Sequence, residues 1–231
     1  MILTVTPEDR REPEYNGQMT QLFGDRANPW DGPCGHLVRQ RPETDNPAHF
    51  HEADQYQIVI GGGGKVGGHR VAFGDIHYAD GYSGYGPIET DADGLDYLTL
   101  RPIFDKTNHP LPKFAALAKG RRGRQHMAQM DLSPTASGTK VLFERPDGVA
   151  MVQQTLAPRA AAEAVAARGG AYWVVMRGSV ISESRLLPQQ TIVWVGQGET
   201  APAMTAGDEG AVLLAACFSD HESSAVRRKV A

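Results

Sequence analysis

The sequence predicts an all-β protein made of two similar modules in tandem. First, the chain aligns with itself without a gap at a shift of 116 residues, and the matches include glycine and proline, whose backbone geometry is restricted. Second, short apolar runs alternate with turn residues, and the 231 residues include 26 Gly and 15 Pro. The clearest matches are Asp31-Gly32 with Asp147-Gly148, Pro42 with Pro158, Gly62 with Gly178, Gly94 with Gly210, and Ile58-Val59-Ile60 with Val174-Val175-Met176.

The repeat divides the chain into four parts. Residues 1–30 are polar and broken by proline and glycine, so we expect an irregular arm with one short strand. The modules span 31–105 and 141–225, and a linker covers 106–140. The predicted strands are Gln57–Ile60, Arg70–Phe73, Asp75–Ala79 and Leu95–Leu100 in the first module, and Tyr172–Met176, Val180–Ser184, Thr191–Val195 and Ala211–Phe218 in the second.

Local propensity and the repeat disagree over one segment of the second module. Residues 159–167 are rich in alanine, the best helix former, and predict a helix when read alone. The 116-residue shift instead makes this segment an edge strand or loop. We follow the repeat, because tertiary context overrides propensity.

The first module contains a stretch that carries a candidate site. It begins with His49 and His51, continues through Gln55 and Gln57, and ends at a run of glycines. Side chains alternate along a strand, so these four residues lie on one face if the strand is continuous. Paired imidazoles on a sheet are a common beginning of a transition-metal site.

The spacing of His49, His51, Gln55 and Gly62 resembles the first motif of the cupin family: His-x-His, three residues, Glu, six residues, Gly. Gln55 stands where the family usually has glutamate. The duplication is similar to that of bicupins. The resemblance implies two double-stranded β-helix (jelly-roll) cupin barrels in tandem, and a divalent transition metal (Fe, Mn, Ni or Zn) in the first.

The second cupin motif is incomplete in this sequence. Counted from Gly74, the position of the family's third histidine falls on Tyr85. His77 shares the parity of Tyr85, and His69 is a weaker substitute. We therefore predict metal ligands His49, His51, Gln55 and His77, with Tyr85 as the alternative fourth ligand. Tyr85, or the nearby Tyr82, is the candidate proton donor.

The repeat also predicts that the second module lacks this chemistry. The shift carries every candidate ligand onto an apolar residue, so we expect the second module to be structural. The counterparts of His49, His51, Gln55, His77 and Tyr85 are Val165, Ala167, Ala171, Val193 and Ala201.

Composition and charge limit the expected binding partners and the expected location of the protein. A net charge of −4 disfavours a nucleic-acid binder, so the basic run from Lys119 to Arg124 is interpreted as a solvated linker. No apolar run reaches the ~18 residues of a membrane span, and the N-terminus lacks a signal-peptide pattern, so a cytoplasmic location is expected. Family resemblance implies a homodimer.

Two functional hypotheses follow. The first is a metal-dependent enzyme, such as a dioxygenase or isomerase, that acts on a small organic molecule in the first module. The second is a non-catalytic or metal-free cupin that binds a small ligand at the same place. Glutamine in place of glutamate favours the second, because an uncharged amide is a weaker ligand than a carboxylate.

Overall fold

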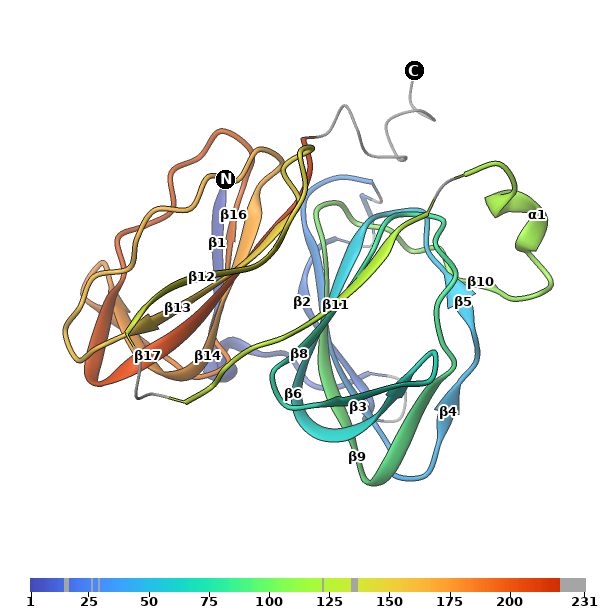
Figure 1. The fold of residues 1–231 in the computed structure, drawn as a ribbon, viewed down its shortest axis with the longest axis horizontal. Helices are drawn as coiled ribbons and strands as arrows, with labels where there is room; N and C mark the ends of the chain where they lie inside the picture. Colours follow the sequence, from blue (N-terminus) through green and yellow to red (C-terminus); the bar gives the residue numbers. More distant parts are fainter. Residues whose placement is uncertain (15–16, 26, 29, 122, 134–136, 221–231) are drawn as a thin grey trace. The chain divides into compact units, whose positions relative to one another are not determined.

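The computed structural model describes residues 1–231 except 15–16, 26, 29, 122, 134–136 and 221–231 (Figure 1). Arg122 of the basic run and the end of the predicted second module lie outside the described residues. The chain is all-β, as predicted, and forms two compact units. We call Arg11–Ala128 the N-terminal module, and Met1–Arg10 with the described residues from Gln129 to Asp220 the C-terminal module.

The N-terminal module contains an eight-stranded sheet with the order β11-β8-β6-β9-β3-β2, in which β4 also pairs with β9 and β7 with β6 (Figure 1). A second sheet pairs β5 with β10. The elements are β2 Met19–Phe23, β3 Cys34–Gln40, β4 Asp45–Asn46, β5 His49–Phe50, β6 Gln55–Val66, β7 His69–Ala72, β8 Asp75–Ala79, β9 Ile88–Arg101, β10 His109–Pro110, α1 Ala115–Ala118 and β11 Gln125–Gln129.

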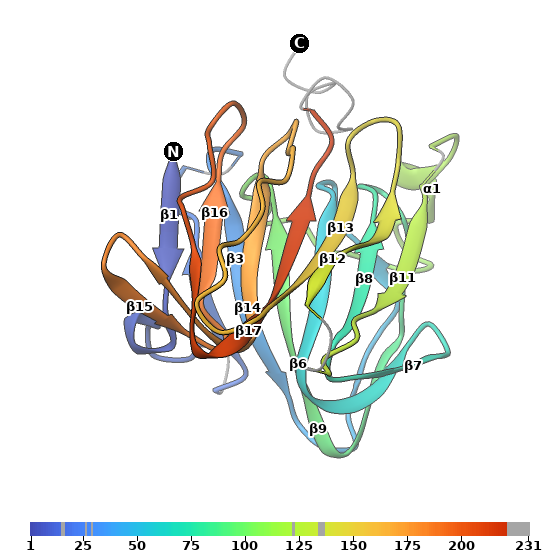
Figure 2. The same ribbon diagram turned by 60° about the vertical axis from the view of Figure 1, so that its left-hand side comes forward.

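The C-terminal module contains a seven-stranded sheet with the order β1-β16-β14-β17-β13-β12, and β15 pairs with β14 (Figure 2). Its first strand comes from the N-terminus of the chain. Its elements are β1 Ile2–Val5, the 3-10 helix η1 Pro7–Asp9, β12 Gly138–Glu144, β13 Ala150–Leu156, β14 Ala171–Ser182, β15 Arg185–Pro188, β16 Ile192–Val195 and β17 Thr205–Cys217.

The 116-residue shift relates the strands of the two modules. It carries β3 onto β13, β6 onto β14 and β7 onto β15, residue for residue. The glycines explain part of this agreement. Gly62 and Gly178 have φ of 66° and 69°, and a Cβ at either would lie 2.1 Å from the carbonyl oxygen of Gly94 or Gly210. Only glycine fits such a position, so the repeat preserves the same close approach between two paired strands in both modules.

Two expectations about architecture had different outcomes. Each sheet is an open path with two edge strands, so the sheets are not closed barrels, and the tandem-barrel arrangement is not confirmed. Residues 159–167 form no helix, and Ala161 makes a single bridge to Thr205. The small apolar side chains of this segment contribute to packing instead, because Ala162, Val165 and Ala167 lie against the apolar core of the C-terminal module.

The predicted arm and linker both contain strands. Residues 1–30 supply β1 to the C-terminal module and β2 to the N-terminal module. The linker segment supplies β10, α1 and β11, and β11 pairs with β8. The predicted domain boundaries stay predictions. No helix among the described residues is long and apolar enough to span a membrane.

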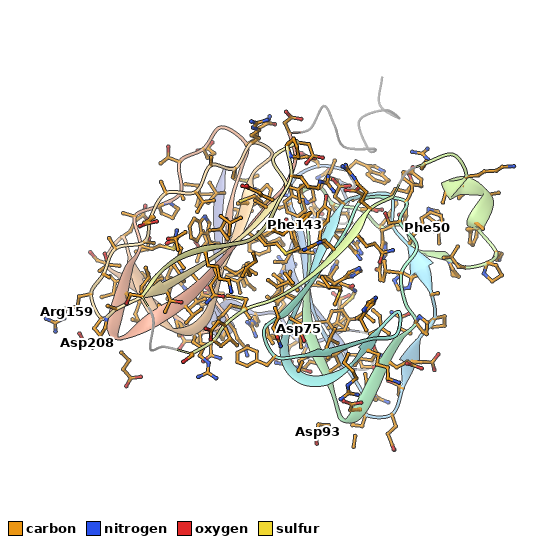
Figure 3. All side chains as sticks on the ribbon, viewed as in Figure 1. Phe50, Asp75, Asp93, Phe143, Arg159 and Asp208 are labelled. Carbon is orange, nitrogen blue, oxygen red and sulfur yellow. The ribbon has the colours of Figure 1, made fainter. Side chains whose placement is uncertain are left out.

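The modules are stabilised mainly by buried apolar side chains. The C-terminal core includes Trp173, Val193 and Leu213, and the N-terminal core includes Val59 and Leu95. Charged pairs lie mostly at the surface, as Figure 3 shows for Arg159 and Asp208, whose Nε and Oδ1 atoms are 3.0 Å apart. Such exposed pairs contribute about 0–1 kcal/mol each, so burial dominates.

Candidate functional site

A cavity of about 850 Å³ lies in the N-terminal module. Strands β3, β6 and β9 form one wall, and residues 104–108 form part of another. Gln57 on β6 and Thr99 on β9 are cross-strand partners, and both line the cavity. The other lining residues that matter here are His49, His51, Tyr85 and Arg101. The sequence therefore brings three of its predicted site residues to one hollow.

His49 and His51 lie side by side, with ring centroids 5.2 Å apart and ring planes at 90°. The Nδ1 of His49 is 2.7 Å from the carbonyl oxygen of Pro47, and the Nδ1 of His51 contacts the carbonyl oxygen of Thr107. A carbonyl only accepts, so each Nδ1 carries the proton and each Nε2 carries a lone pair. The backbone thus fixes the tautomer of both rings.

Burial keeps both histidines neutral. Desolvation lowers the pKa of His49, and the nearby Arg101 guanidinium lowers it further, against an opposing effect of the Pro47 carbonyl. The same burial, followed by Arg101 and then His49, holds the pKa of His51 well below its usual value. At neutral pH the pair therefore offers lone pairs rather than positive charge.

Tyr85 completes a hydrogen-bonded cluster with these histidines. It forms an antiparallel bridge with His49, and its hydroxyl donates to the Nε2 of His49 at 2.9 Å. Burial raises the pKa of Tyr85 to about 12. Its phenol therefore stays protonated near neutral pH and acts as a hydrogen-bond donor in the cavity.

Gln55 is buried beside Arg101. Its Oε1 accepts from the Nε of Arg101 at 3.2 Å, and the Nη1 of Arg101 donates to the backbone oxygen of Asp105 at 2.7 Å. The Nε2 of Gln55 has no hydrogen-bond partner in the part of the chain that the structure describes. The amide oxygen predicted as a metal ligand thus contacts a cation.

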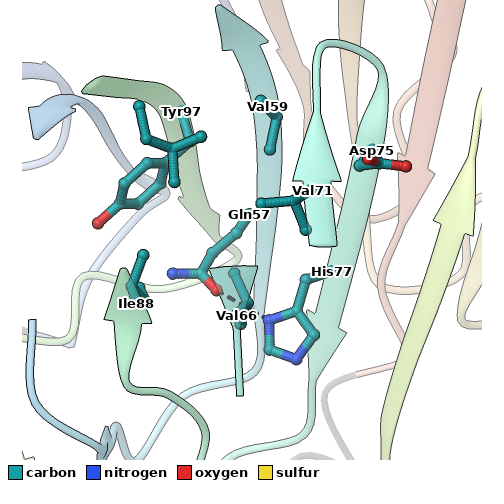
Figure 4. A pocket seen from close by; sticks show the side chains of 9 residues that line it. Gln57, Val59, Val66, Val71, Asp75, His77, Ile88 and Tyr97 are labelled. Carbon is teal, nitrogen blue, oxygen red and sulfur yellow. Dashed lines mark hydrogen bonds between the residues drawn. The ribbon is translucent and has the colours of Figure 1, made fainter. Parts of the chain in front are cut away.

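His77 is placed at a different point. Its Nδ1 is 2.8 Å from the Oε1 of Gln57 (Figure 4), and its Nε2 is 3.0 Å from the Oε1 of Gln125. It borders a small pocket with apolar neighbours such as Val59 and Val71. Burial lowers its pKa to about 4. Both ring nitrogens thus contact amides, and neither faces His49 or His51.

Tyr82 also lies away from the cavity. Its hydroxyl donates to the Oε2 of Glu52 at 2.6 Å, and the Arg121 guanidinium lies 3.6 Å from the centre of its ring. The other carboxylate oxygen of Glu52 is 3.1 Å from the Nε2 of His109. His69, the weaker substitute, is exposed on β7. Of the two candidate proton donors, only Tyr85 contacts the histidine pair.

The donors present do not complete a metal site. The four predicted ligands do not converge, because His77 is turned elsewhere and Gln55 is bonded to Arg101. Within the described residues, no three His, Cys, Asp or Glu side chains gather in a way that would hold a metal ion. Two imidazoles beside a guanidinium fall short of the three or four protein ligands of typical zinc sites.

Sequence reasoning missed Arg101 and the segment that follows it. The predicted strand ended one residue earlier, at Leu100, and Arg101 lies outside the spacing of both family motifs. A signal was present in the repeat, because the counterpart of Arg101 is Cys217, in the apolar core of the C-terminal module. A charged residue whose counterpart in the other module is apolar is therefore a candidate site residue, just as a histidine is.

The counterparts of the site residues lie in an apolar core. Ala171 and Val193 belong to the buried cluster of the C-terminal module, and Val165, Ala167 and Ala201 pack against it. The same strand register thus surrounds a polar cavity in one module and aliphatic side chains in the other.

The fold has known relatives among solved structures, although no family model and no curated protein sequence matches this chain. The chain is similar to the bacterial pirin YhhW of Escherichia coli, solved in complex with nickel(II), with a TM-score of 0.61 and 11% identity over 95% of this chain and all of that one. It is also similar to salicylate 1,2-dioxygenase of Pseudoaminobacter salicylatoxidans, solved as adducts with gentisate (TM-score 0.56, 10% identity, 100% of this chain and 83% of that one). A third is the 11S globulin of Wrightia tinctoria, which has an auxin binding site (TM-score 0.64, 13% identity, 95% and 84%). These are cupin-fold proteins with different functions, so the comparison establishes the cupin fold.

Proposed function

We propose that the protein binds a small organic molecule in the cavity of the N-terminal module, against His49, His51 and Tyr85. The observation that carries this proposal is the difference between the modules. Polar side chains surround about 850 Å³ in one, and their counterparts form an apolar core in the other. The similarity to cupin-fold proteins that hold auxin or gentisate supports it. The assignment of the site to a module of residues 31–105 is part of this proposal.

A ligand-binding screen tests this function. A molecule that binds only the folded protein raises the melting temperature. We expect the full chain to be stabilised by at least one class of small organic molecule, and the effect to vanish in a His49→Ala, His51→Ala double variant. His69→Ala is the matched control, because His69 is exposed and does not line the cavity. Stabilisation that survives in the double variant would place the site elsewhere.

A second candidate is a metal-dependent oxidoreductase of the dioxygenase type. The observation in its favour is that His49 and His51 both line the cavity with Nε2 in the unprotonated form that binds metals. The nickel(II) complex of YhhW and the dioxygenase neighbour also support it. In this alternative the divalent ion (Fe, Mn, Ni or Zn) would need donors besides the histidines, because Gln55 and His77 have other partners.

Metal analysis separates the two candidates. The protein would be purified without chelator and its metal content measured by plasma mass spectrometry. Under the first proposal we expect substoichiometric metal and ligand binding that persists in EDTA. Stoichiometric metal that is lost in the His49→Ala, His51→Ala double variant would favour the second. A homodimer and a cytoplasmic location are separate expectations, and neither candidate function requires them.

A further inference from the structure

Arg101 is a buried cation in the wall of the cavity. It is the last residue of β9, lines the cavity, and is 5% exposed. Its guanidinium is oriented by the Oε1 of Gln55 and the backbone oxygen of Asp105. A charge in such a place is costly unless it is hydrogen-bonded or paired.

Among the described residues that line the cavity, Arg101 is the only buried cation. His49 and His51 are neutral for the reasons given above, and Lys106, the other cation that lines the cavity, is exposed. The carboxylate of Asp105 is 2% exposed and accepts from the backbone N–H groups of Glu52, Ala53 and Thr107. Its negative charge is therefore held by the loop, and it also makes the cavity unfavourable for a multiply charged anion.

A second observation is the amide of Gln55, which is 1% exposed. Its oxygen contacts Arg101, while its Nε2 makes no hydrogen bond of normal geometry within the described part of the chain and lies near the Tyr85 hydroxyl. Buried donors are rarely left unpaired, because each costs desolvation energy that a hydrogen bond would recover. An acceptor near the guanidinium would satisfy the amide and would also accept a charge-assisted hydrogen bond.

The remaining buried wall is apolar or neutral, and Asp45, which also lines the cavity, is exposed. Tyr97 and Phe104 line the cavity and are buried, as is Thr99. A ligand suited to this wall combines one negatively charged acceptor with a small apolar body. A carboxylate meets the first condition, because its geometry matches the planar guanidinium.

We propose that Arg101 anchors the carboxylate of a small organic monoacid, and that this binding needs no metal ion. The inference rests on the proposed ligand-binding function and names the class of its ligand. In this site Arg101 supplies the positive charge that attracts the acid, and Tyr97 and Phe104 contact its apolar part.

Matched pairs of probes test the charge directly. Acetate, phenylacetate and benzoate would each be compared with the corresponding primary amide by calorimetry on the full chain in EDTA. We expect at least one acid to bind about tenfold or more tightly than its amide, since charge-assisted hydrogen bonds are roughly twice as strong as neutral ones. Arg101→Gln should remove this preference. Arg70→Gln is the control, because Arg70 is an exposed arginine paired with Asp91 in the same module.

A second variant keeps the proposal testable if Arg101→Gln does not fold. Gln55→Glu places a carboxylate beside the guanidinium and should compete with the ligand, lowering acid affinity about tenfold while Arg101 remains. Acids and amides that bind equally, or acids that bind only after nickel is added, would overturn the carboxylate anchor and leave the proposed cavity function in place. If none of the acids binds, with or without nickel, the carboxylate anchor fails, and the ligand screen described above decides the proposed cavity function separately.

Discussion

Gln57 on β6 faces Thr99 on β9 in the N-terminal module, and at the same register Trp173 on β14 faces Ala215 on β17 in the C-terminal module. One pair lines a cavity, and the other is part of a close-packed core. The backbone tolerates both interiors because strand pairing and the close backbone contacts at glycine do not depend on which side chains point inward. The comparison shows that the repeat specifies the sheet, while inward-facing residues specify a site or a core.

The largest expected loss of stability comes from a substitution in the close-packed core of the C-terminal module. Trp173→Ala removes a buried indole and should lower the free energy of unfolding by about 3–5 kcal/mol. Gln57→Ala, at the matching position, removes a side chain that borders an existing hollow and should cost about 1 kcal/mol. Urea unfolding followed by circular dichroism measures both. Equal losses would contradict the distinction between the two interiors.

The next effect is a pH dependence confined to the polar interior. Burial lowers the pKa of His77 from 6.5 to about 4, so the unfolded chain binds the proton more tightly than the folded one. The stability contributed by neutral His77 is therefore complete above pH 6.5 and is lost as the pH falls toward 4. The loss amounts to about 3 kcal/mol.

His77→Val tests the origin of this slope, because the counterpart of His77 is Val193. Stability would be measured by urea unfolding at several pH values between 7 and 4, roughly the interval between the two pKa values. We expect the variant to lose less stability on acidification than the wild-type protein. An unchanged slope would assign the acid sensitivity to other groups, such as His49 and His51, whose pKa values are also lowered.

Replacing the two histidines by their apolar counterparts from the C-terminal module should have a smaller effect on stability. The double change His49→Val, His51→Ala reproduces Val165 and Ala167. Two hydrogen bonds to backbone carbonyls and the one from the Tyr85 hydroxyl are lost, so we expect a cost of about 2–3 kcal/mol with the fold intact. Circular dichroism checks the fold, and calorimetry should find ligand binding abolished. A double variant that unfolds would show that the histidines are structural.

The sequence predicted the sheet content and the repeat because both follow from short-range patterns. Parity predicted His49, His51 and Gln55 on one face of a continuous strand, but the strand is interrupted between Phe50 and Gln55, and β5 and β6 belong to different sheets. The repeat correctly outweighed the helix propensity of residues 159–167. Three features depend on long-range geometry instead. The sheets remain open, the nitrogens of His77 reach Gln57 and Gln125, and Arg101 meets Gln55 across 46 residues of sequence. No local spacing encodes which of several inward side chains pair with one another.

The smallest expected effect concerns a single hydroxyl. Tyr85→Phe removes the hydrogen bond to the Nε2 of His49 and should cost about 1 kcal/mol. Tyr78→Phe is the matched control, since the hydroxyl of Tyr78 donates to Asp80 at 3.0 Å and Tyr78 does not line the cavity. Because the Tyr85 hydroxyl donates to the lone pair of neutral His49, it stabilises the unprotonated ring. Only Tyr85→Phe should therefore raise the pKa of His49 toward its usual value, as followed by NMR of the imidazole C–H protons. A shift of the same size in both variants, or a decrease in the pKa, would mean that Tyr85 does not hold His49 in the neutral form.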